Sequence, residues 1–429
     1  MGIKAGFAEA DITPPLGTHK IGWLKDIVSD RVLDPLSARV MVMESDGARA
    51  AFVQLDTALV LRDDVIELRS RVADAYGFPA ENVLCAATHN HAGPAVAGIG
   101  DVERDEAYVK QMLRRTVDAF GEALDGMRDA QVAFGSAFEF EVPHNRRVVM
   151  RDGTVRTHGT FEDPDALYIE GPIDPELAVM AARGSDGNLL GAVVRGVAGE
   201  VHHGGDTCLS AGFPGELARE MKQRGCPVTL FLNGASGNIS DHDPTRGGAR
   251  MSKEHIGRAL ADDVGKALEG VHWQDSLRLG CRSDVLALPF RNPTEDQVSG
   301  TARGAQRFID SAIYERAIPA LVERIRREGT QPAEVQVIFM DEYAWTAVPA
   351  EYFVQLGLRI KEKAHPRHAL VVGYANGMVG YVPHREAFER GGYETTFAPW
   401  SPVAPGAGEM LAEEALEAAI KDYKSRQKA

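Results

Sequence analysis

Long apolar runs, paired cysteine motifs and an excess of basic residues are all missing from this 429-residue chain. No run approaches the roughly 18 apolar residues that a membrane-spanning helix needs, so we predict no membrane span. The start of the chain lacks the apolar core of a secretory signal. The four cysteines are scattered without a C-x-x-C motif, which predicts free thiols and a cytoplasmic location; they are Cys85, Cys208, Cys226 and Cys281.

Basic residues are outnumbered, with 47 Lys and Arg against 62 Asp and Glu and a net charge of −15. This balance argues against nucleic acid or an anionic membrane as the partner. The expected partner is a small-molecule substrate, and the sequence is compatible with a homo-oligomer.

Strand-like and helix-like segments alternate along most of the chain, without a repeat, a low-complexity tract or a clear linker. We therefore predict an α/β fold with mixed β-sheets layered with helices, in one compact catalytic domain that spans residues 1–429. Expected strands are 38–43, 50–55, 83–87, 131–142, 189–197, 228–232, 335–340, 344–348 and 369–374. Expected helices are 61–76, 109–124, 252–268, 303–327 and 408–425.

Two histidines, His89 and His91, follow the predicted buried strand 83–87 directly and precede a Gly93-Pro94 break. The ends of strands are where α/β proteins place ligand chemistry. Because side chains alternate along an extended chain, both imidazoles are expected on one face. One histidine can then bind a metal while the other faces the substrate. Two loop histidines bonded to the backbone would give the same pattern, so the motif alone leaves both interpretations open.

Further polar groups follow other predicted strands, and they are Glu200, His202 and His203; Ser240, Asp241 and His242; and Tyr381. Glu351 lies instead at a predicted helix start. A catalytic zinc takes three protein ligands and keeps one position open. The histidines here are far apart in sequence, so spacing alone does not identify a zinc site.

An ordered set of motifs resembles the catalytic domain of the neutral (non-lysosomal) ceramidases, in the form of their shorter bacterial relatives that lack a C-terminal β-rich domain. The motifs are Asp11-Ile-Thr-Pro, Ala87-Thr-His-Asn-His-Ala-Gly-Pro94, Asn145-Arg146, Gly237-Asn-Ile-Ser240, Pro349-Ala-Glu351-Tyr-Phe, Asn376-Gly-Met-Val-Gly-Tyr381-Val-Pro and Gly392-Tyr393-Glu394. The resemblance covers most of residues 5–400.

The resemblance implies one Zn²⁺ ion bound by two histidines, a glutamate and a tyrosine. Three of these positions match His89, Glu351 and Tyr381. The family usually has a His-Pro pair at the remaining position, and this chain has none. We select His202 there, with His203 and Glu200 as the alternatives.

The resemblance also implies an attack on a carbonyl by metal-activated water, with catalytic roles for His91, Arg146 and Ser240. Substrate contacts are expected from Asn145, Asn238 and Tyr393. Ser240 matches a serine that is a candidate nucleophile in the family. However, Asn238 stands here where the family has an acid, and we expect Ser240 to contact the substrate instead.

The predicted function is zinc-dependent hydrolysis of an amide or related acyl bond. The segment 148–175 is rich in charged residues, Gly and Pro, which indicates a small polar substrate rather than ceramide. Two other functions fit the same residues. One is a metal-dependent lyase or isomerase acting on a sugar-like molecule, and the other is a non-catalytic zinc- or ligand-binding protein.

Overall fold

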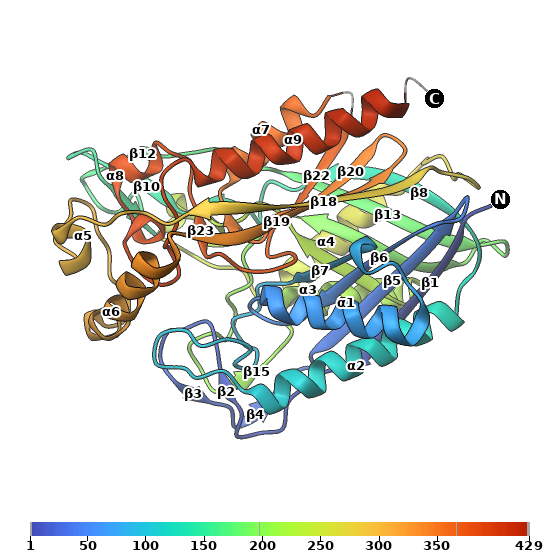
Figure 1. Ribbon diagram of the computed structural model, residues 1–429, viewed down its shortest axis with the longest axis horizontal. Coiled ribbons are helices and arrows are strands. Elements are labelled where there is room, and N and C mark those ends of the chain that lie inside the picture. Colours follow the sequence, from blue (N-terminus) through green and yellow to red (C-terminus); the bar gives the residue numbers. More distant parts are fainter. Residues whose placement is uncertain (1, 197, 366, 427–429) are drawn as a thin grey trace.

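Two β-sheets lie against each other between layers of helices in the computed structural model (Figure 1), which describes residues 2–196, 198–365 and 367–426. The larger sheet has the order β16 (Thr229–Asn233), β14 (Leu189–Gly196), β13 (Glu176–Gly184), β8 (Arg128–Phe138), β1 (Lys4–Asp11), β5 (Ser37–Ser45), β6 (Ala48–Leu55), β7 (Val83–Ala87). The smaller sheet has the order β18 (Leu279–Pro289), β19 (Thr330–Met340), β20 (Tyr343–Ala347), β22 (His368–Val372).

Apolar side chains from both sheets share one buried core. Phe52 on β6 meets Trp345 on β20 edge to face, with 5.2 Å between the ring centroids. Met41, Leu84 and Leu370 belong to the same cluster. Strands that are covered on both faces need near-continuous apolar sequence, which is why β5, β6 and β7 read as apolar runs.

Helices cover the outer faces of both sheets (Figure 1). The larger sheet is covered by α1 (Arg62–Tyr76) and α2 (Glu106–Asp125) over one part and by α3 (Gly212–Gln223) and α4 (Lys253–Ala267) over another. The smaller sheet packs against α6 (Ser311–Glu328), α7 (Val354–Lys363) and α9 (Ala407–Arg426). Short helices are α5 (Glu295–Ser299) and α8 (Ala387–Arg390). The predicted α/β class with mixed sheets layered with helices is confirmed.

Short strand pairs outside the two large sheets hold the loops together. They are β2 (His19–Lys20) with β3 (Ile27–Val28), β4 (Arg31–Val32) with β15 (Cys208–Leu209), β9 (His144–Asn145) with β17 (Ile239–Ser240), and β21 (Glu351–Tyr352) with β23 (Tyr381–Val382). A further sheet has the order β11 (Val155–Thr157), β10 (Arg147–Met150), β12 (Ala166–Ile169).

Several sequence expectations differ from the structure. The predicted helix 303–327 starts only at Ser311, because Asp310 accepts the N–H of Ala312 as its cap and residues 303–310 form an irregular loop. Glu351 lies on β21, and the helix begins later, at Val354. Strands β1, β10 to β13 and β18 had not been predicted. Val197, the last residue of the predicted strand 189–197, lies outside the described residues. The four cysteines are free thiols, as expected.

Within the described ranges, no helix combines the length and apolarity needed to cross a bilayer.

Three loops meet where parallel strands end. The three parallel pairs within the two large sheets are β6 with β7, β14 with β16, and β20 with β22. The Ala87 N–H donates to Tyr374 O (3.0 Å), which ties the loop after β22 to β7. The Gly373 N–H donates to Asn233 O (2.9 Å), and a Cβ at Gly373 would lie 2.6 Å from Gly234 O. Because only glycine permits this close approach, the loops after β7, β16 and β22 converge on one place.

Candidate metal centre and active site

His89 is held in a fixed orientation at the end of β7. Its backbone has a φ of +66°, a left-handed conformation that is uncommon for a residue with a side chain. The buried Asn90 amide group donates to Asp56 O and Ser210 O (3.2 and 2.8 Å), and these bonds fix the loop that carries His89. The His89 ring stacks on Tyr374 with 4.2 Å between centroids. The strand and its loop therefore fix where the imidazole points.

The protonation of His89 follows from its surroundings. Burial lowers the pKa of His89 to about 4, so the imidazole is neutral at pH 7. Nδ1 lies 3.0 Å from the Ala58 carbonyl, which can only accept, so we assign the proton to Nδ1. Nε2 then carries a lone pair. It faces His91 Nε2 at 3.0 Å and Glu351 Oε2 at 3.4 Å.

Glu351 and Tyr381 are neighbours across the parallel pair of β21 and β23. Burial raises the pKa of Glu351 to about 7, although a hydrogen bond with Tyr381 and the charge of Arg146 oppose that shift. The same burial raises the pKa of Tyr381 far above its ordinary value. Three of the four residues selected for a metal, His89, Glu351 and Tyr381, therefore lie together.

Arg146 lies beside this group and is 8% exposed. Its guanidinium donates to Tyr381 OH (3.2 Å), Gly237 O (2.9 Å) and Glu394 Oε1 (2.8 Å). Glu394 is fully buried, and its other oxygen accepts from Arg147 and Thr157, both at 2.8 Å. Burial alone would raise the pKa of Glu394, but the two guanidinium groups outweigh it and lower that pKa to about 2. Sequence reasoning gave Glu394 no role, although it ends the Gly392-Tyr393-Glu394 motif.

His202, which was selected as the second histidine ligand, belongs to a different set of contacts. Its Nδ1 lies 3.0 Å from Glu200 Oε1, and its Nε2 lies 2.9 Å from Met251 O and 3.6 Å from Asp241 Oδ2. Burial would lower the pKa of His202, but the bond and charge of Glu200 outweigh it and raise that pKa to about 9. A protonated imidazole has no lone pair for a metal. Glu200 also accepts the N–H of Phe213 at the start of α3 (2.7 Å).

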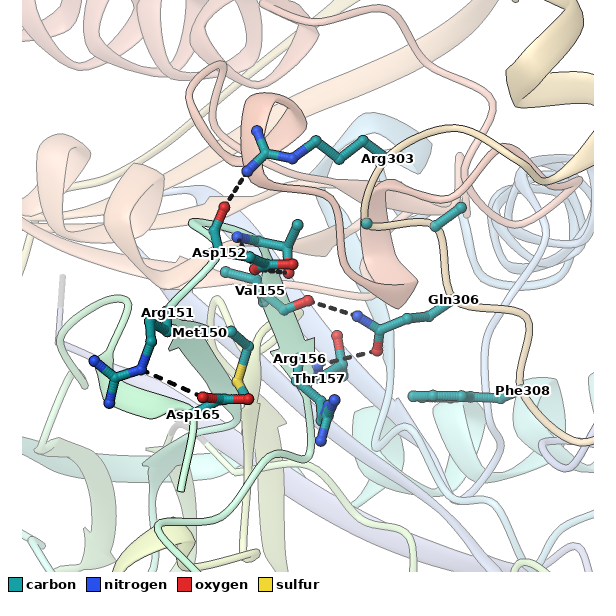
Figure 2. Close-up of a pocket in the computed structure, with 13 residues that line it drawn as sticks. Met150, Arg151, Asp152, Val155, Arg156, Thr157, Asp165, Arg303, Gln306 and Phe308 are labelled. Carbon is teal, nitrogen blue, oxygen red and sulfur yellow. Dashed lines mark hydrogen bonds and ion pairs between the residues drawn. The ribbon is translucent and has the colours of Figure 1, made fainter. Parts of the chain in front are cut away.

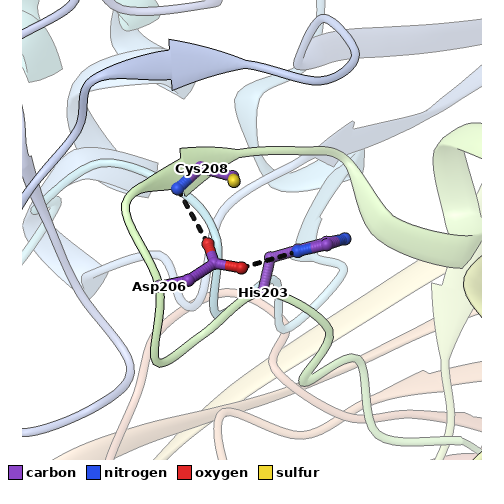
Figure 3. A group of neighbouring side chains, drawn as sticks. All are labelled: His203, Asp206 and Cys208. Atoms are coloured by element: carbon purple, nitrogen blue, oxygen red, sulfur yellow. Dashed lines mark hydrogen bonds and ion pairs between the residues drawn. The ribbon is translucent and has the colours of Figure 1, made fainter.

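His203 belongs to a third group, with Asp206 and Cys208 (Figure 3). One ligand atom from each lies within 4.8 Å of the others, and His203 Nδ1 is 2.8 Å from Asp206 Oδ2. Among the described residues, it is the group in which three His, Cys, Asp or Glu side chains lie close enough together to hold a metal ion. Two cations of the chain are already there. Arg31 Nε donates to Cys208 Sγ (2.7 Å), and Lys20 Nζ lies 3.8 Å from Asp206 Oδ1.

The remaining predicted residues are Ser240, Asn238, Asn145 and Tyr393, and their contacts are as follows. Ser240 is buried, and its Oγ accepts the N–H of His242 (2.9 Å). Asn238 and Asn145 are occupied in holding loops: Asn238 Oδ1 accepts from Val354 N (2.9 Å), and Asn145 Nδ2 donates to Pro172 O (3.0 Å). The Tyr393 ring meets the Tyr381 ring edge to face at 5.6 Å.

The donor set at His89 suits a zinc ion. It offers one imidazole nitrogen with a fixed tautomer, one carboxylate and one phenol oxygen, which are hard or intermediate ligands of the kind zinc binds. The hydrogen bond from Nδ1 to a carbonyl is the usual support of a metal-binding histidine. The phenol OH accepts from Arg146, whose charge opposes the rise that burial causes in the pKa of Tyr381.

Comparisons with known proteins agree with the motif resemblance. The neutral ceramidase of Pseudomonas aeruginosa is 23% identical over 441 residues, which cover 86% of this chain and 65% of that protein. A crystal structure of neutral ceramidase from P. aeruginosa matches with a TM-score of 0.75 at 17% identity, over 98% of this chain and 74% of that one. A ceramidase structure described as complexed with C2 matches with a TM-score of 0.76 at 16% identity, over 99% and 76%. No model of a protein family matches.

These matches confirm the resemblance to neutral ceramidases that the motifs predicted. The fold likeness extends over nearly the whole chain, whereas the matched region spans about two thirds of the length of the curated relative. The fold is therefore shared, and the activity has to be argued from the residues of this chain.

Proposed function

We propose that the chain is a zinc-dependent hydrolase that cleaves an amide or related acyl bond in a small polar substrate. The observation that carries this proposal is the distance of 3.4 Å between His89 Nε2 and Glu351 Oε2, both on largely buried side chains. Tyr381 is the neighbour of Glu351 across the strand pair, and Arg146 donates to the Tyr381 hydroxyl. The likeness to neutral ceramidases supports amide-bond hydrolysis.

His89, Glu351 and Tyr381 would hold the zinc ion. His91 is the histidine whose side chain contacts that of His89, with 3.0 Å between the two Nε2 atoms. When bound, zinc supplies a Lewis acid and lowers the pKa of a coordinated water to about 7. His91 stays outside the ligand set in this proposal. The rings of His89 and His91 meet edge to face at 4.6 Å, so His91 borders the place where a substrate carbonyl would sit.

Two side chains act on the substrate. Arg146 binds the carbonyl oxygen and stabilises the negative charge that develops there during attack, because its guanidinium is buried and fixed by Glu394. His91 carries no charge before the reaction, since burial and the neighbouring His89 and Arg146 lower its pKa. A neutral imidazole can take the proton of the attacking water and give it to the leaving amine.

Ser240 is a substrate-contacting group in this proposal rather than the nucleophile. A nucleophilic serine needs a side-chain base within hydrogen-bond reach. The Ser240 Oγ instead accepts a backbone N–H, from His242, at 2.9 Å. Tyr393 borders Tyr381 and is the second residue expected to touch the substrate.

The proposal is tested by hydrolysis in ¹⁸O-labelled water with a panel of N-acyl compounds that includes ceramide. One labelled oxygen is expected in the carboxylic acid product, and activity is expected to disappear on chelation and to return with zinc. Turnover without solvent oxygen in the product would instead support a lyase or isomerase. Full activity after removal of all metal would refute the zinc site, and ceramide as the sole accepted substrate would refute the polar substrate.

A further inference from the structure

An open cavity of about 770 Å³ lies between the three-stranded sheet of β10, β11 and β12 and the loop at residues 303–308 (Figure 2). Its lining combines charged and polar groups with apolar surface. Three arginines, Arg151, Arg156 and Arg303, contribute guanidinium groups, and Asp152 and Asp165 contribute carboxyl groups. The Phe308 ring supplies an aromatic surface at one end. The polar segment 148–175 therefore forms a wall of a cavity.

The charges in this cavity are largely balanced within the protein. Arg151 Nε lies 3.3 Å from Asp165 Oδ1, Arg303 donates to the Asp152 carbonyl, and Arg156 pairs with Asp163. Such pairs keep donors and acceptors side by side in an accessible wall. They suit a neutral group that both donates and accepts hydrogen bonds better than they suit a bare anion.

The cavity and the candidate active site share a wall. Phe308 stacks on Tyr393 with 4.7 Å between centroids and 10° between planes, and Tyr393 in turn meets Tyr381. Thr157 lines the cavity, and its hydroxyl donates to Glu394 Oε2 (2.8 Å), the carboxylate that fixes Arg146. A group bound in the cavity therefore lies two aromatic rings away from Tyr381.

Two histidines beside this wall have nitrogens without a partner. His158 follows Thr157 in sequence, and its ring lies 5.1 Å from that of His242 and 6.3 Å from that of Phe308. His158 Nδ1 and His242 Nε2 are buried atoms without a hydrogen-bond partner in the described structure. Leaving a buried polar atom unpaired costs about 1–3 kcal/mol, but neither histidine is among the residues that line the cavity. Burial and nearby cations lower the pKa of both histidines, so each neutral ring can donate and accept.

We propose that this cavity is the subsite for a neutral, hydroxyl-rich, carbohydrate-like part of the substrate. The inference rests on the proposed function, because it assigns the cavity to a part of the substrate away from the scissile N-acyl bond. Hydroxyl groups donate to carboxylates and accept from guanidinium groups at the same time. The C–H face of a sugar ring packs on an aromatic ring such as Phe308.

Binding is measured first, by calorimetry with N-acetylglucosamine as the probe, in wild type and in Phe308→Ala and Arg303→Ala. The same titration in His89→Ala requires neither metal nor turnover. We expect saturable binding to wild type and to His89→Ala. Affinity should fall about tenfold in Phe308→Ala, which loses an apolar contact surface. It should fall about fivefold in Arg303→Ala, which loses charged hydrogen bonds. Arg326→Ala, an exposed change on α6, is the matched control and should bind as wild type does.

Kinetics then separate the subsite from the reaction. For an N-acyl amino sugar, Phe308→Ala should raise KM about tenfold and leave kcat within about twofold, since the ring contacts only the remote group. A short N-acyl compound without hydroxyl groups should show no change in either constant. Absence of probe binding to wild type, or equal binding to all variants, would overturn the subsite even if short amides are hydrolysed. Probe binding by a zinc-loaded wild-type chain that hydrolyses none of the N-acyl compounds would overturn the proposed function and leave the subsite in place.

Discussion

Two groups of side chains in this molecule carry the atoms that metals bind, and they differ in what surrounds those atoms. His203, Asp206 and Cys208 form the first group, in which one ligand atom from each side chain lies within 4.8 Å of the others. Lys20 and Arg31 already occupy its neighbourhood, with Arg31 Nε 2.7 Å from the Cys208 sulfur. The His203 and Asp206 side chains are 31% and 43% exposed, so water competes for them as well.

In the group of His89, Glu351 and Tyr381, the surroundings of His89 and Glu351 favour a cation. The His89 proton is fixed on Nδ1 by Ala58, and Nε2 points at Glu351. Burial raises the pKa of Glu351, which means that the carboxylate is poorly solvated and gains from a cation. We therefore expect the tautomer, burial and local charge of the ligand atoms, rather than their proximity alone, to decide which of the two groups binds a metal.

The largest expected effect comes from removing one histidine from each group. His89→Ala should lower bound zinc to under about 0.1 per chain and lower kcat/KM by at least about a thousandfold, because both the ligand and the activated water are lost. His203→Ala should keep wild-type zinc and activity. Metal analysis of the purified proteins and the N-acyl assay check both. Zinc lost from His203→Ala and retained in His89→Ala would reverse the comparison.

The next effect tests the arginine beside each group. Arg146→Lys keeps a positive charge but loses the fork that joins Tyr381 OH, Gly237 O and Glu394. We expect kcat/KM to fall about a hundredfold with zinc retained, since the carbonyl oxygen loses a fixed donor. Arg31→Lys at the His203 group is the matched change and should leave steady-state kinetics unaltered. Wild-type kcat/KM in Arg146→Lys would remove Arg146 from the mechanism.

The parts of the molecule that could be predicted from sequence are those set by local pattern. The strand Val83–Ala87 was predicted with its observed ends, because an apolar run of five bounded by polar residues is long enough for a buried strand and too short for a helix. The helix α1 was predicted within one residue for the same kind of reason. The partners of His89 were found only through the motif resemblance, since Glu351 and Tyr381 are 262 and 292 positions away in the chain.

The rest depended on tertiary contacts. Glu351 looked like a helix-start acid, but its register with Tyr381 places it on a short strand. His202 was selected because the family resemblance implies a second histidine ligand after this strand, yet its Nδ1 lies against Glu200, two residues before it. No local sequence pattern predicts that Glu394 accepts hydrogen bonds from Arg146 and Arg147, because it lies about 250 residues after them in the chain.

A smaller effect concerns His202, which belongs to neither group, and the dependence of the free energy of unfolding on its protonation. A histidine whose pKa rises from 6.5 to about 9 on folding stabilises the folded chain fully below pH 6.5, and that stability is lost as pH rises through 9. We therefore expect the free energy of unfolding of wild type to fall by on the order of 2 kcal/mol between pH 6.5 and 9. His202→Gln should lack this fall, and His255→Gln, an exposed change on α4, should keep it. Denaturant unfolding at a series of pH values measures it, and an equal slope in His202→Gln would show that His202 is not protonated in the folded chain.

The smallest expected effect concerns Asp206, whose carboxylate joins His203 to the backbone of Cys208. Asp206→Asn keeps the shape and an acceptor oxygen but removes the charge that Lys20 faces. Because the carboxylate is 43% exposed, water screens that charge, and the free energy of unfolding should fall by less than about 1 kcal/mol. Zinc content and kcat/KM should remain those of wild type. If the His203 group held a metal, the same substitution would remove one of its charged ligands, so a measurable loss of zinc would show that two cations beside a cluster do not prevent metal binding. Unchanged zinc content in Asp206→Asn would indicate that local charge, rather than the proximity of ligand atoms, decides which of the two groups binds zinc.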